Sequence, residues 1–337
     1  MLHSHRCPRM LDEFLACPVH RTPLTRSGEY FLCTADCRYP VVQGVPFLLP
    51  RDITHTHRGI SDRSFATAEA IRSGASIGGD RPPAGHVDAW VQEDIAATNS
   101  NLYRAVKGSL SGYPIPDIPL EPARPGARLL DIGCGWGRWC IAAARRGFLP
   151  VGIDPSLESV LAGQRVAAQL GVKAFFVVGD SRYLPFRPNV FDAAFSYSVL
   201  QHFAQHDVRA TLSSLAPTLR PDATTKLHLL NRYGLRSIQV QLFRLFREAR
   251  DFETRYWSPS EMLRCFSIDI GPSALEIDGF FVQGRYEDRH LFRPHHRLLV
   301  ECSHTLTSMA RWLPLLKNIA DNVFVVSRRI APSADQG

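Results

Sequence analysis

The chain has 337 residues, of which 45% are hydrophobic and 21% charged, proportions typical of a globular protein that can bury one large core or two modest ones. No stretch approaches the roughly 20 apolar residues that a membrane-spanning helix requires, and residues 1–14 lack the apolar run of a secretory signal, so we expect a cytoplasmic protein. The formal net charge of +7 comes mostly from arginine without a run of five basic residues, so it does not select nucleic acid as a partner.

Residues 11–50 contain two closely spaced pairs of potential metal ligands. Cys17 and His20 are separated by two residues, Cys33 and Cys37 by three, and twelve residues lie between the pairs. Two such pairs on tight turns can present four side chains tetrahedrally to a zinc ion. We therefore predict a small module that is stabilised by zinc.

An apolar segment, YPVVQGVPFLL, follows from Tyr39 to Leu49. Together with LACP around Cys17, it resembles the small zinc-ribbon-like domains that partner methyltransferases or are fused to them. The resemblance implies a β-rich module with a structural zinc ion, although His20 stands where these domains usually have a cysteine. A metal-free module held by its apolar tail is the alternative. Cys7 could substitute as a ligand, but we expect it to be a free thiol.

Residues 51–85 are rich in Gly, Ser, Pro, Arg and Asp, a composition that predicts a mobile linker. We expect no role for His55 and His57, which fall in this segment. Apolar residues from 86 to 106 then recur at helical spacing and predict two short helices. These helices either pack on a sheet edge or help to close a ligand pocket.

The stretch from Arg128 to Gly137, RLLDIGCGWG, predicts a short buried strand that ends in glycines and opens a helix. Gly133, Gly135 and Gly137 allow the backbone to approach a ligand closely, and the unpaired N–H groups of the helix start point toward it. Dinucleotide-binding folds use a similar turn. Asp131 disfavours that alternative, because its carboxylate would repel a pyrophosphate.

Further acidic residues follow the next two predicted strands. Residues 149–154 form an apolar strand ending in Asp154, whose carboxylate can accept hydrogen bonds from both hydroxyls of a ribose or, alternatively, cap the following helix. Residues 174–178 form another strand, followed by Asp180. Because the carboxyl ends of parallel strands meet at one edge of a sheet, these groups should lie around one ligand.

This series resembles the class I S-adenosylmethionine-dependent methyltransferases. The resemblance implies an α/β fold with a Rossmann-like seven-stranded sheet and helices on both faces, in addition to the small N-terminal module. It also implies that the glycines pass under the methionine end of the cofactor, that Asp154 holds the ribose and that Asp180 meets the adenine amino group. The expected cofactor-binding residues are Asp131, Gly133, Gly135, Gly137, Asp154, Asp180, Ser181 and Ser198.

The same resemblance predicts the rest of the sheet and the division of the chain. Strands are expected at 190–196 and 227–230, and a terminal hairpin from 275–282 and 322–326. The predicted domains are the zinc-ribbon-like module at 11–50, the linker at 51–85 and the methyltransferase domain at 86–337. Within the last, we expect a substrate lid at about 233–320.

The end of the fourth strand is where this family places groups that face the substrate. We therefore select His202 and Tyr197 as candidates for catalysis. His202 could deprotonate an oxygen or nitrogen nucleophile near neutral pH. The alternative is a histidine at a helix start that packs on Phe203.

The leading functional hypothesis is an S-adenosylmethionine-dependent methyltransferase for a small-molecule acceptor of lipid-like or saccharide-like character, by resemblance to the quinone-biosynthesis-like group. An RNA methyltransferase is the second hypothesis, because a zinc module also precedes an rRNA guanine methyltransferase domain. Against it, the chain has no NPPY-type tetrapeptide and no basic strip interleaved with aromatic residues. A non-catalytic binding or activator protein is the third. The sequence does not determine the oligomeric state.

Overall fold

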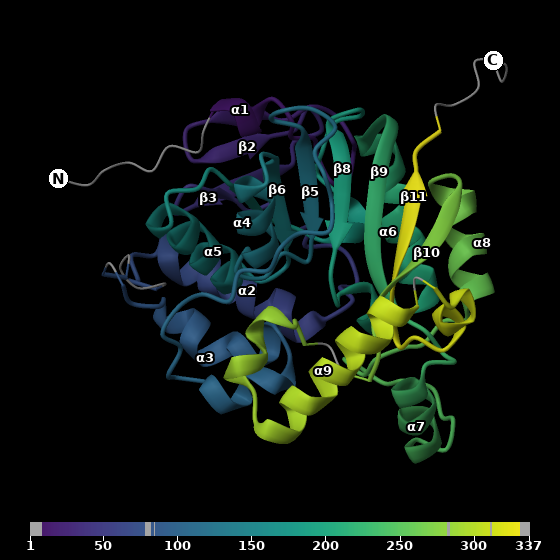
Figure 1. The fold of residues 1–337 in the computed structure, drawn as a ribbon. Coiled ribbons are helices and arrows are strands. Elements are labelled where there is room, and N and C mark those ends of the chain that lie inside the picture. The colour runs from purple at the N-terminus through teal and green to yellow at the C-terminus, as the bar shows by residue number, and fades with distance from the viewer. Residues whose placement is uncertain (1–8, 78–81, 84, 282–283, 311, 331–337) are drawn as a thin grey trace, which may run out of the picture.

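The computed structural model describes residues 9–77, 82–83, 85–281, 284–310 and 312–330. A seven-stranded sheet lies at the centre and has the order β10-β11-β9-β8-β5-β6-β7 (Figure 1). All neighbouring strands from β7 to β9 are parallel, and β11 is antiparallel to both its neighbours. The strands are β5 (Arg128–Ile132), β6 (Leu149–Asp154), β7 (Phe175–Val178), β8 (Phe191–Ser196), β9 (Leu219–Leu230), β10 (Ser273–Gly279) and β11 (Asn322–Arg328).

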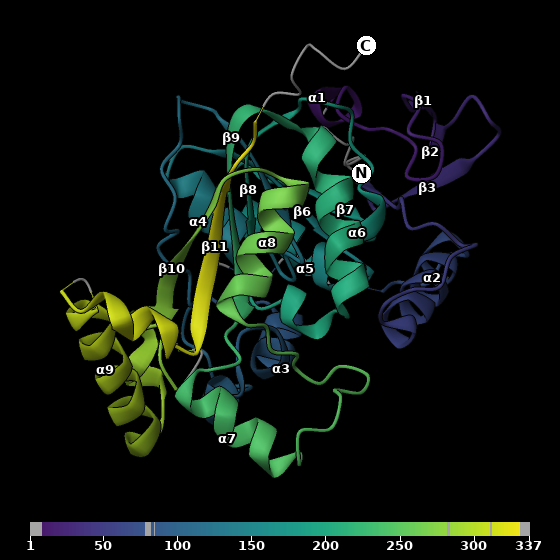
Figure 2. The ribbon, with the colours of Figure 1, turned by 90° about the vertical axis from the view of Figure 1, so that its right-hand side faces the viewer.

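Helices cover both faces of this sheet (Figure 2). Side chains of successive strand residues alternate between the faces, so Leu130 packs in the cluster that holds α6 and α8, whereas Leu129 packs in the cluster that holds α4. The predicted α/β fold with a seven-stranded sheet is confirmed. The helices are α2 (Arg58–Arg72), α3 (Ala89–Thr98), α4 (Arg138–Arg145), α5 (Leu157–Gln169), α6 (Gln205–Leu215), α7 (Leu235–Phe243), α8 (Pro259–Asp269) and α9 (Pro294–Met309).

Short 3-10 helices connect several of these elements. Among the described residues they are η1 (Asn101–Val106), η2 (Ser181–Tyr183), η3 (Leu200–His202), η4 (Ala216–Thr218), η5 (Glu287–Leu291) and η6 (Pro314–Asn318). The predicted pair of helices between 86 and 106 corresponds to α3 and η1. No helix of the described ranges has both the length and the apolar character needed to cross a lipid bilayer.

The N-terminal module is a four-stranded antiparallel sheet that follows the short helix α1 (Arg9–Asp12). It packs against the β7 edge of the central sheet, where the Leu48 N–H donates to the Val178 carbonyl at 2.8 Å. The Ala16 N–H likewise donates to the Pro185 carbonyl at 2.9 Å. The module therefore covers a sheet edge that would otherwise present unpaired backbone groups. Its strands are β1 (Thr25–Ser27), β2 (Tyr30–Leu32), β3 (Arg38–Val42) and β4 (Val45–Pro46).

The prediction of a linker at 51–85 was wrong for the centre of that segment. The 15-residue helix α2 occupies its centre and packs on α5. Its fully buried residues are the small Ser61, Ser64, Thr67 and Ala68, whereas Phe65 and Ile71 are only partly buried, so its hydrophobic stripe is weak. The Ser64 hydroxyl donates to the Pro155 carbonyl at 2.6 Å, which ties α2 to the site that follows β6.

Two further predictions need correction. Strand β9 begins at Leu219, eight residues before the predicted start. The span 233–320 is not a lid throughout, because α8 and β10 belong to the sheet layers and Trp257 is buried in the core. Of the described residues in this span, α7, the loop after it and the α9 region remain available to cover a pocket. The predicted terminal hairpin is present as β10 and β11, although Val282 lies outside the described residues.

Candidate functional site

The carboxyl ends of β5, β6, β7 and β8 bring the predicted cofactor residues to one edge of the sheet. A cavity of about 130 Å³ lies there. Ile132, Ile153 and Val199 supply apolar walls, and the adjoining polar groups come from the predicted set. The predicted residues that line it are Gly133, Asp154, Asp180, Ser181 and Ser198.

The glycine turn has the backbone conformation that requires glycine. Gly133, Gly135 and Gly137 have φ values of 70°, 52° and 76°, in the left-handed region that other residues rarely adopt. A Cβ at Gly133 would lie 2.3 Å from Cγ2 of Val199. At Gly135 no described atom outside its chain neighbours lies within 4 Å of the Cβ position, so this glycine faces open space. Gly133 thus permits close packing, and Gly135 leaves room beside the turn.

Asp154 is fixed by backbone hydrogen bonds at the end of β6. Its two carboxylate oxygens accept from the Gly135 N–H at 3.0 Å and from the Ser156 N–H at 2.8 Å. The first bond ties the carboxylate to the glycine turn, whereas the second orients it at the start of α5. Burial raises the pKa of this carboxyl group, and the two N–H donors oppose that effect. Helix capping in the adjacent position is supplied by the hydroxyl of Ser156, so Asp154 is not the N-cap residue.

Asp180 lies in the cavity wall but already has a strong partner. Its carboxylate forms an ion pair with Arg182 at 2.7 Å, and a second bond from that guanidinium reaches its other oxygen at 3.1 Å. His55 Nδ1 lies 3.7 Å from the same carboxylate. The carboxylate of Asp180, predicted to contact adenine, is therefore held in place by Arg182. A ligand could use only the lone pairs of its oxygens that do not already accept from Arg182.

Asp131 lies one layer beneath the cavity and does not line it. It is almost fully buried, and its Oδ2 accepts from the Cys140 thiol at 3.3 Å. Its Oδ1 has no hydrogen-bond partner among the described residues. Burial raises the pKa of Asp131 to about 7, and the nearby positive charge of Arg138 only partly offsets this effect.

A second, larger cavity of about 1140 Å³ adjoins the first. Ser198, His202 and Phe252 line both, so the two spaces meet at the loop that follows β8. The second cavity is bounded by α3, α7 and α9, through residues such as Ala96, Leu235 and Leu299. Together they provide a ligand site at the strand ends and a separate, wider space beyond it.

His202 occupies the junction between the cavities. Its Nδ1 lies 2.7 Å from the Phe252 carbonyl, which can only accept, so Nδ1 carries the proton. Nε2 is then an acceptor, and the Gln201 amide nitrogen lies 3.3 Å away. Burial lowers the pKa of His202 to about 4, so the ring is neutral at pH 7. The ring stacks on Phe252 at 4.1 Å, a different aromatic from the Phe203 expected from the sequence.

Tyr197 does not fit the role predicted for it. Its ring is buried between Trp139 and His228, and its hydroxyl donates to Asp278 at 2.8 Å. It lines neither of the two cavities as the described residues form them. Burial and the Asp278 charge raise the pKa of this phenol above its usual range. We therefore withdraw Tyr197 from the catalytic candidates, because strand alternation turns it away from the site.

Two residues that the sequence did not single out for the site belong to it. His57, just before α2, lines the first cavity, and its Nε2 is buried without a hydrogen-bond partner in the described structure. Asn99, which the sequence suggested only as part of a closing helix, lines the second cavity. Its Oδ1 accepts from the Trp136 indole at 3.0 Å, whereas its Nδ2 has no partner in the part of the chain described. Neither position has a local motif.

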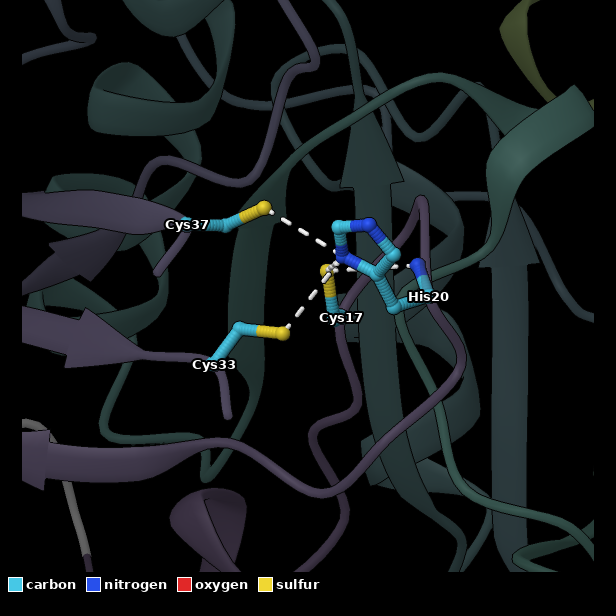
Figure 3. Close-up of side chains that lie close together, drawn as sticks. All are labelled: Cys17, His20, Cys33 and Cys37. Atoms are coloured by element: carbon cyan, nitrogen blue, oxygen red, sulfur yellow. Dashed lines mark hydrogen bonds between the residues drawn. The ribbon is translucent and has the colours of Figure 1, made fainter. Parts of the chain in front are cut away.

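The four predicted metal ligands converge in the N-terminal module (Figure 3). The His20 Nδ1 atom lies 3.6 Å from the sulfur atoms of Cys17 and Cys33 and 3.4 Å from that of Cys37. Tetrahedral zinc with ordinary bond lengths separates nitrogen and sulfur ligands by about 3.5 Å. The donor set and its spacing therefore fit zinc. Cys7 lies outside the described residues.

Groups around these ligands support the same interpretation. The His20 N–H donates to the Cys17 sulfur at 3.4 Å, and the Ala35 N–H donates to the Cys33 sulfur at 3.4 Å. The Tyr39 hydroxyl lies 3.3 Å from the Cys17 sulfur. Such bonds orient thiolates and reduce their charge, as outer groups do around metal sites.

Comparison with known proteins identifies the central segment. Residues 129–222 match the family described as methyltransferase domain. The chain is 33% identical over 174 residues to the probable fatty acid methyltransferase Rv3720 of Mycobacterium tuberculosis, a match covering 52% of this chain and 38% of that protein. It is 32% identical over 113 residues to the ubiquinone biosynthesis O-methyltransferase of Azorhizobium caulinodans, covering 34% of this chain and 44% of that protein.

Among solved structures, a S-adenosylmethionine-dependent methyltransferase of Methanosarcina mazei aligns with 66% of this chain and all of its own, at 17% identity and a TM-score of 0.43. The chain spans less than half the length of the two curated relatives described above. The matched segment, residues 129–222, contains the glycine turn and the strand ends that line the first cavity, so the methyltransferase-domain match falls on this site.

Proposed function

We propose that this protein transfers a methyl group from S-adenosylmethionine to a small-molecule acceptor of lipid-like or saccharide-like character. The observation that carries the proposal is the meeting of two cavities at Ser198 and His202. One lies over the glycine turn and the acidic strand ends, where a cofactor would bind. The other is wider and opens beyond His202, where an acceptor would bind.

The residues around the first cavity fit the cofactor. Asp154 offers the remaining acceptor capacity of its two oxygens to a ribose, and Gly135 leaves open space beside the turn. Two buried polar atoms that line the cavities lack partners among the described residues: Ser198 Oγ, at both cavities, and Asn99 Nδ2, at the second. Because an unpaired buried polar group is costly, these atoms support polar ligand groups where the two cavities meet. When bound, S-adenosylmethionine would supply a methyl group activated by a sulfonium.

The chain's own contribution to such a reaction is positioning and exclusion of water. Methyl transfer needs an in-line approach and a desolvated site more than it needs a strong base. A neutral His202 can orient an acceptor hydroxyl or amine when that group replaces the Gln201 amide as the donor to Nε2, with the Phe252 carbonyl holding the ring. The low pKa of His202 makes it a weak base. We therefore propose that His202 orients the acceptor and takes the acceptor's proton only as the methyl group is transferred.

The acceptor class is supported by the second cavity. Its volume of about 1140 Å³ exceeds the usual range for drug-sized ligands, and its lining combines apolar side chains such as Leu230 and Leu299 with polar ones such as Gln239. The names of the fatty acid and ubiquinone relatives refer to acceptors with hydrocarbon portions. We further propose that the N-terminal module binds one structural zinc ion through Cys17, His20, Cys33 and Cys37.

Calorimetric titration of S-adenosylmethionine into the purified chain tests the cofactor site. We expect binding that Asp154→Ala weakens by roughly 100-fold, because hydrogen bonds to a charged group each contribute about 1.5–3 kcal/mol. Asp117→Ala is the matched control, since that carboxylate is exposed and pairs with Arg146 far from the cavity. Absence of both heat and a thermal shift in the wild-type protein would remove the enzyme proposal.

A further inference from the structure

The helix α7 and the turn after it project from the carboxyl end of the sheet, as both views show (Figures 1 and 2). Apolar side chains on this projection face solvent instead of the core. Phe243 is 80% exposed, Leu245 88% and Phe246 68%. Isolated exposed apolar residues are common, but a run of three large ones within four positions marks an interaction surface.

The turn that carries these side chains is fixed in place. The Leu245 and Phe246 N–H groups donate to carbonyls of α7, and Arg247 forms an ion pair with Glu253 at 2.7 Å. Leu245 and Phe246 have φ values of 50° and 55°, in the left-handed region that bulky residues avoid. The backbone is therefore strained at Leu245 and Phe246, in a turn that hydrogen bonds fix to α7 and that holds both side chains in solvent.

The beginning of α9 adds to the same end of the molecule. Leu298 is 61% exposed there, and its neighbour Leu299 lines the same large cavity as Leu235 at the start of α7. The two helices thus border one opening. We call their exposed apolar residues, Leu242, Phe243, Leu245, Phe246 and Leu298, the apolar rim.

Basic residues surround the apolar rim. Residues 232–255 contain six arginines and three carboxylates; Arg236, Arg247 and Arg250 are exposed, and Arg247 is paired with Glu253. Arg250 is exposed beyond the turn, and Arg293 and Arg297 are exposed at the start of α9. Apolar and aromatic side chains bordered by arginines are the pattern of elements that lie in the interface of an anionic membrane.

We propose that the apolar rim docks on the surface of an anionic lipid bilayer. A second copy of the chain is a poorer occupant, because a two-fold contact would bring the same basic surface against itself. The rim also projects from the body, a shape suited to insertion among lipid headgroups. Docking would place the mouth of the large cavity at the bilayer, where an acceptor with a hydrocarbon tail could enter it. Only this last consequence rests on the proposed function.

The test is cosedimentation of the full chain with lipid vesicles in the absence of cofactor. The vesicles are of phosphatidylcholine alone, or contain roughly one third phosphatidylglycerol. We expect binding to the anionic vesicles that weakens as salt is added, and little binding to the neutral ones. The variant Phe243→Ser/Leu245→Ser/Phe246→Ser should reduce the partition coefficient by about tenfold or more, and Arg250→Glu should reduce it less.

The matched control is Ile268→Ser, since Ile268 on α8 is 67% exposed but lies outside the apolar rim. It should bind vesicles as the wild-type protein does. Equal binding by the triple variant and the wild-type protein would overturn the proposal, as would no binding of the wild-type protein to anionic vesicles. Loss of a dimer in the triple variant, without any vesicle binding by the wild type, would instead identify a second copy as the occupant. The assay contains no cofactor and the calorimetric titration contains no lipid, so failure of one proposal is distinguishable from failure of the other.

Discussion

The buried carboxyl group of Asp131 leads to a prediction about stability and pH. The structure gives it one weak donor, the Cys140 thiol, and leaves Oδ1 without a partner in the described ranges. Burial consequently raises its pKa to about 7, from 3.8 in an exposed position. We predict that Asp131→Asn makes the cofactor-free protein more stable relative to wild type as the pH rises.

The sign follows from which state binds the proton more tightly. Below pH 3.8 the carboxyl is protonated in both states, so it contributes no penalty. Between that value and about 7 the unfolded chain ionises while the folded chain retains its proton, and the free energy of unfolding falls as the pH rises. At about 1.4 kcal/mol for each pH unit, the full effect above pH 7 is about 4 kcal/mol. Asparagine cannot ionise, so the variant escapes this loss.

Urea unfolding of the wild-type protein and the Asp131→Asn variant at about pH 5 and pH 8 measures the effect. The readout is how much the difference between their free energies of unfolding changes from one pH to the other. The new amide of asparagine adds an offset that does not depend on pH. Asp192→Asn is the control, because the Arg128 N–H and the guanidinium groups of Arg124 and Arg220 lower the pKa of Asp192. Its stabilisation is therefore complete above pH 3.8 and is lost only below it, so the difference between this variant and wild type should stay constant between pH 5 and pH 8. A difference between Asp131→Asn and wild type that stays constant between the two pH values would refute the reasoning.

Three further predictions concern the turn, the metal and the histidine. Gly133→Ala should lower the free energy of unfolding by about 2–4 kcal/mol, because the new methyl group would lie 2.3 Å from Val199 at a left-handed backbone position. Gly135→Ala should lower it by only about 1–2 kcal/mol, because its methyl group meets open space. Equal losses of the two variants in urea titrations would contradict this prediction. Cys33→Ser should reduce the zinc measured by atomic emission and lower the Tm, and wild-type protein purified without zinc would favour the metal-free module. His202→Asn should reduce the rate of the proposed methyl transfer without altering the pH dependence of that rate above about pH 5.5, since the wild-type ring is already neutral there. An inflection near pH 6.5 in the wild-type pH–rate profile that disappears in the variant would show that the ring titrates there and would contradict this prediction.

Local sequence was sufficient for the strands that end at the glycine turn and before the acidic residues, whereas the family resemblance supplied the rest of the sheet. The apolar run before Asp154, and the one before Asp180, are bounded strands whose order predicts parallel pairing. The glycine turn is equally local, since a left-handed backbone at Gly133 selects the residue directly. The ligand pairs of the N-terminal module are close in sequence, and their convergence around His20 follows from two short turns.

The linker prediction failed because composition does not describe packing between small residues. Ser64 and Ala68 make no hydrophobic stripe, yet they allow α2 to approach α5 closely, and that contact carries His57 into the first cavity. Nothing near His57 in sequence indicates this, because the partner surface is formed by residues about 100 positions later.

The sequence by itself determined the strands that precede the acidic residues, the glycine turn, the acidic residues at the strand ends and the four candidate metal ligands. Only the tertiary structure decided the direction of side chains and the division between core and surface. Tyr197 and Ser198 are adjacent in sequence, yet one is buried against Asp278 and the other faces the cavity, since neighbouring side chains leave a strand end in different directions. Likewise, the sequence shows that residues 235–246 are rich in apolar side chains, but only the structure shows that those of the apolar rim face solvent.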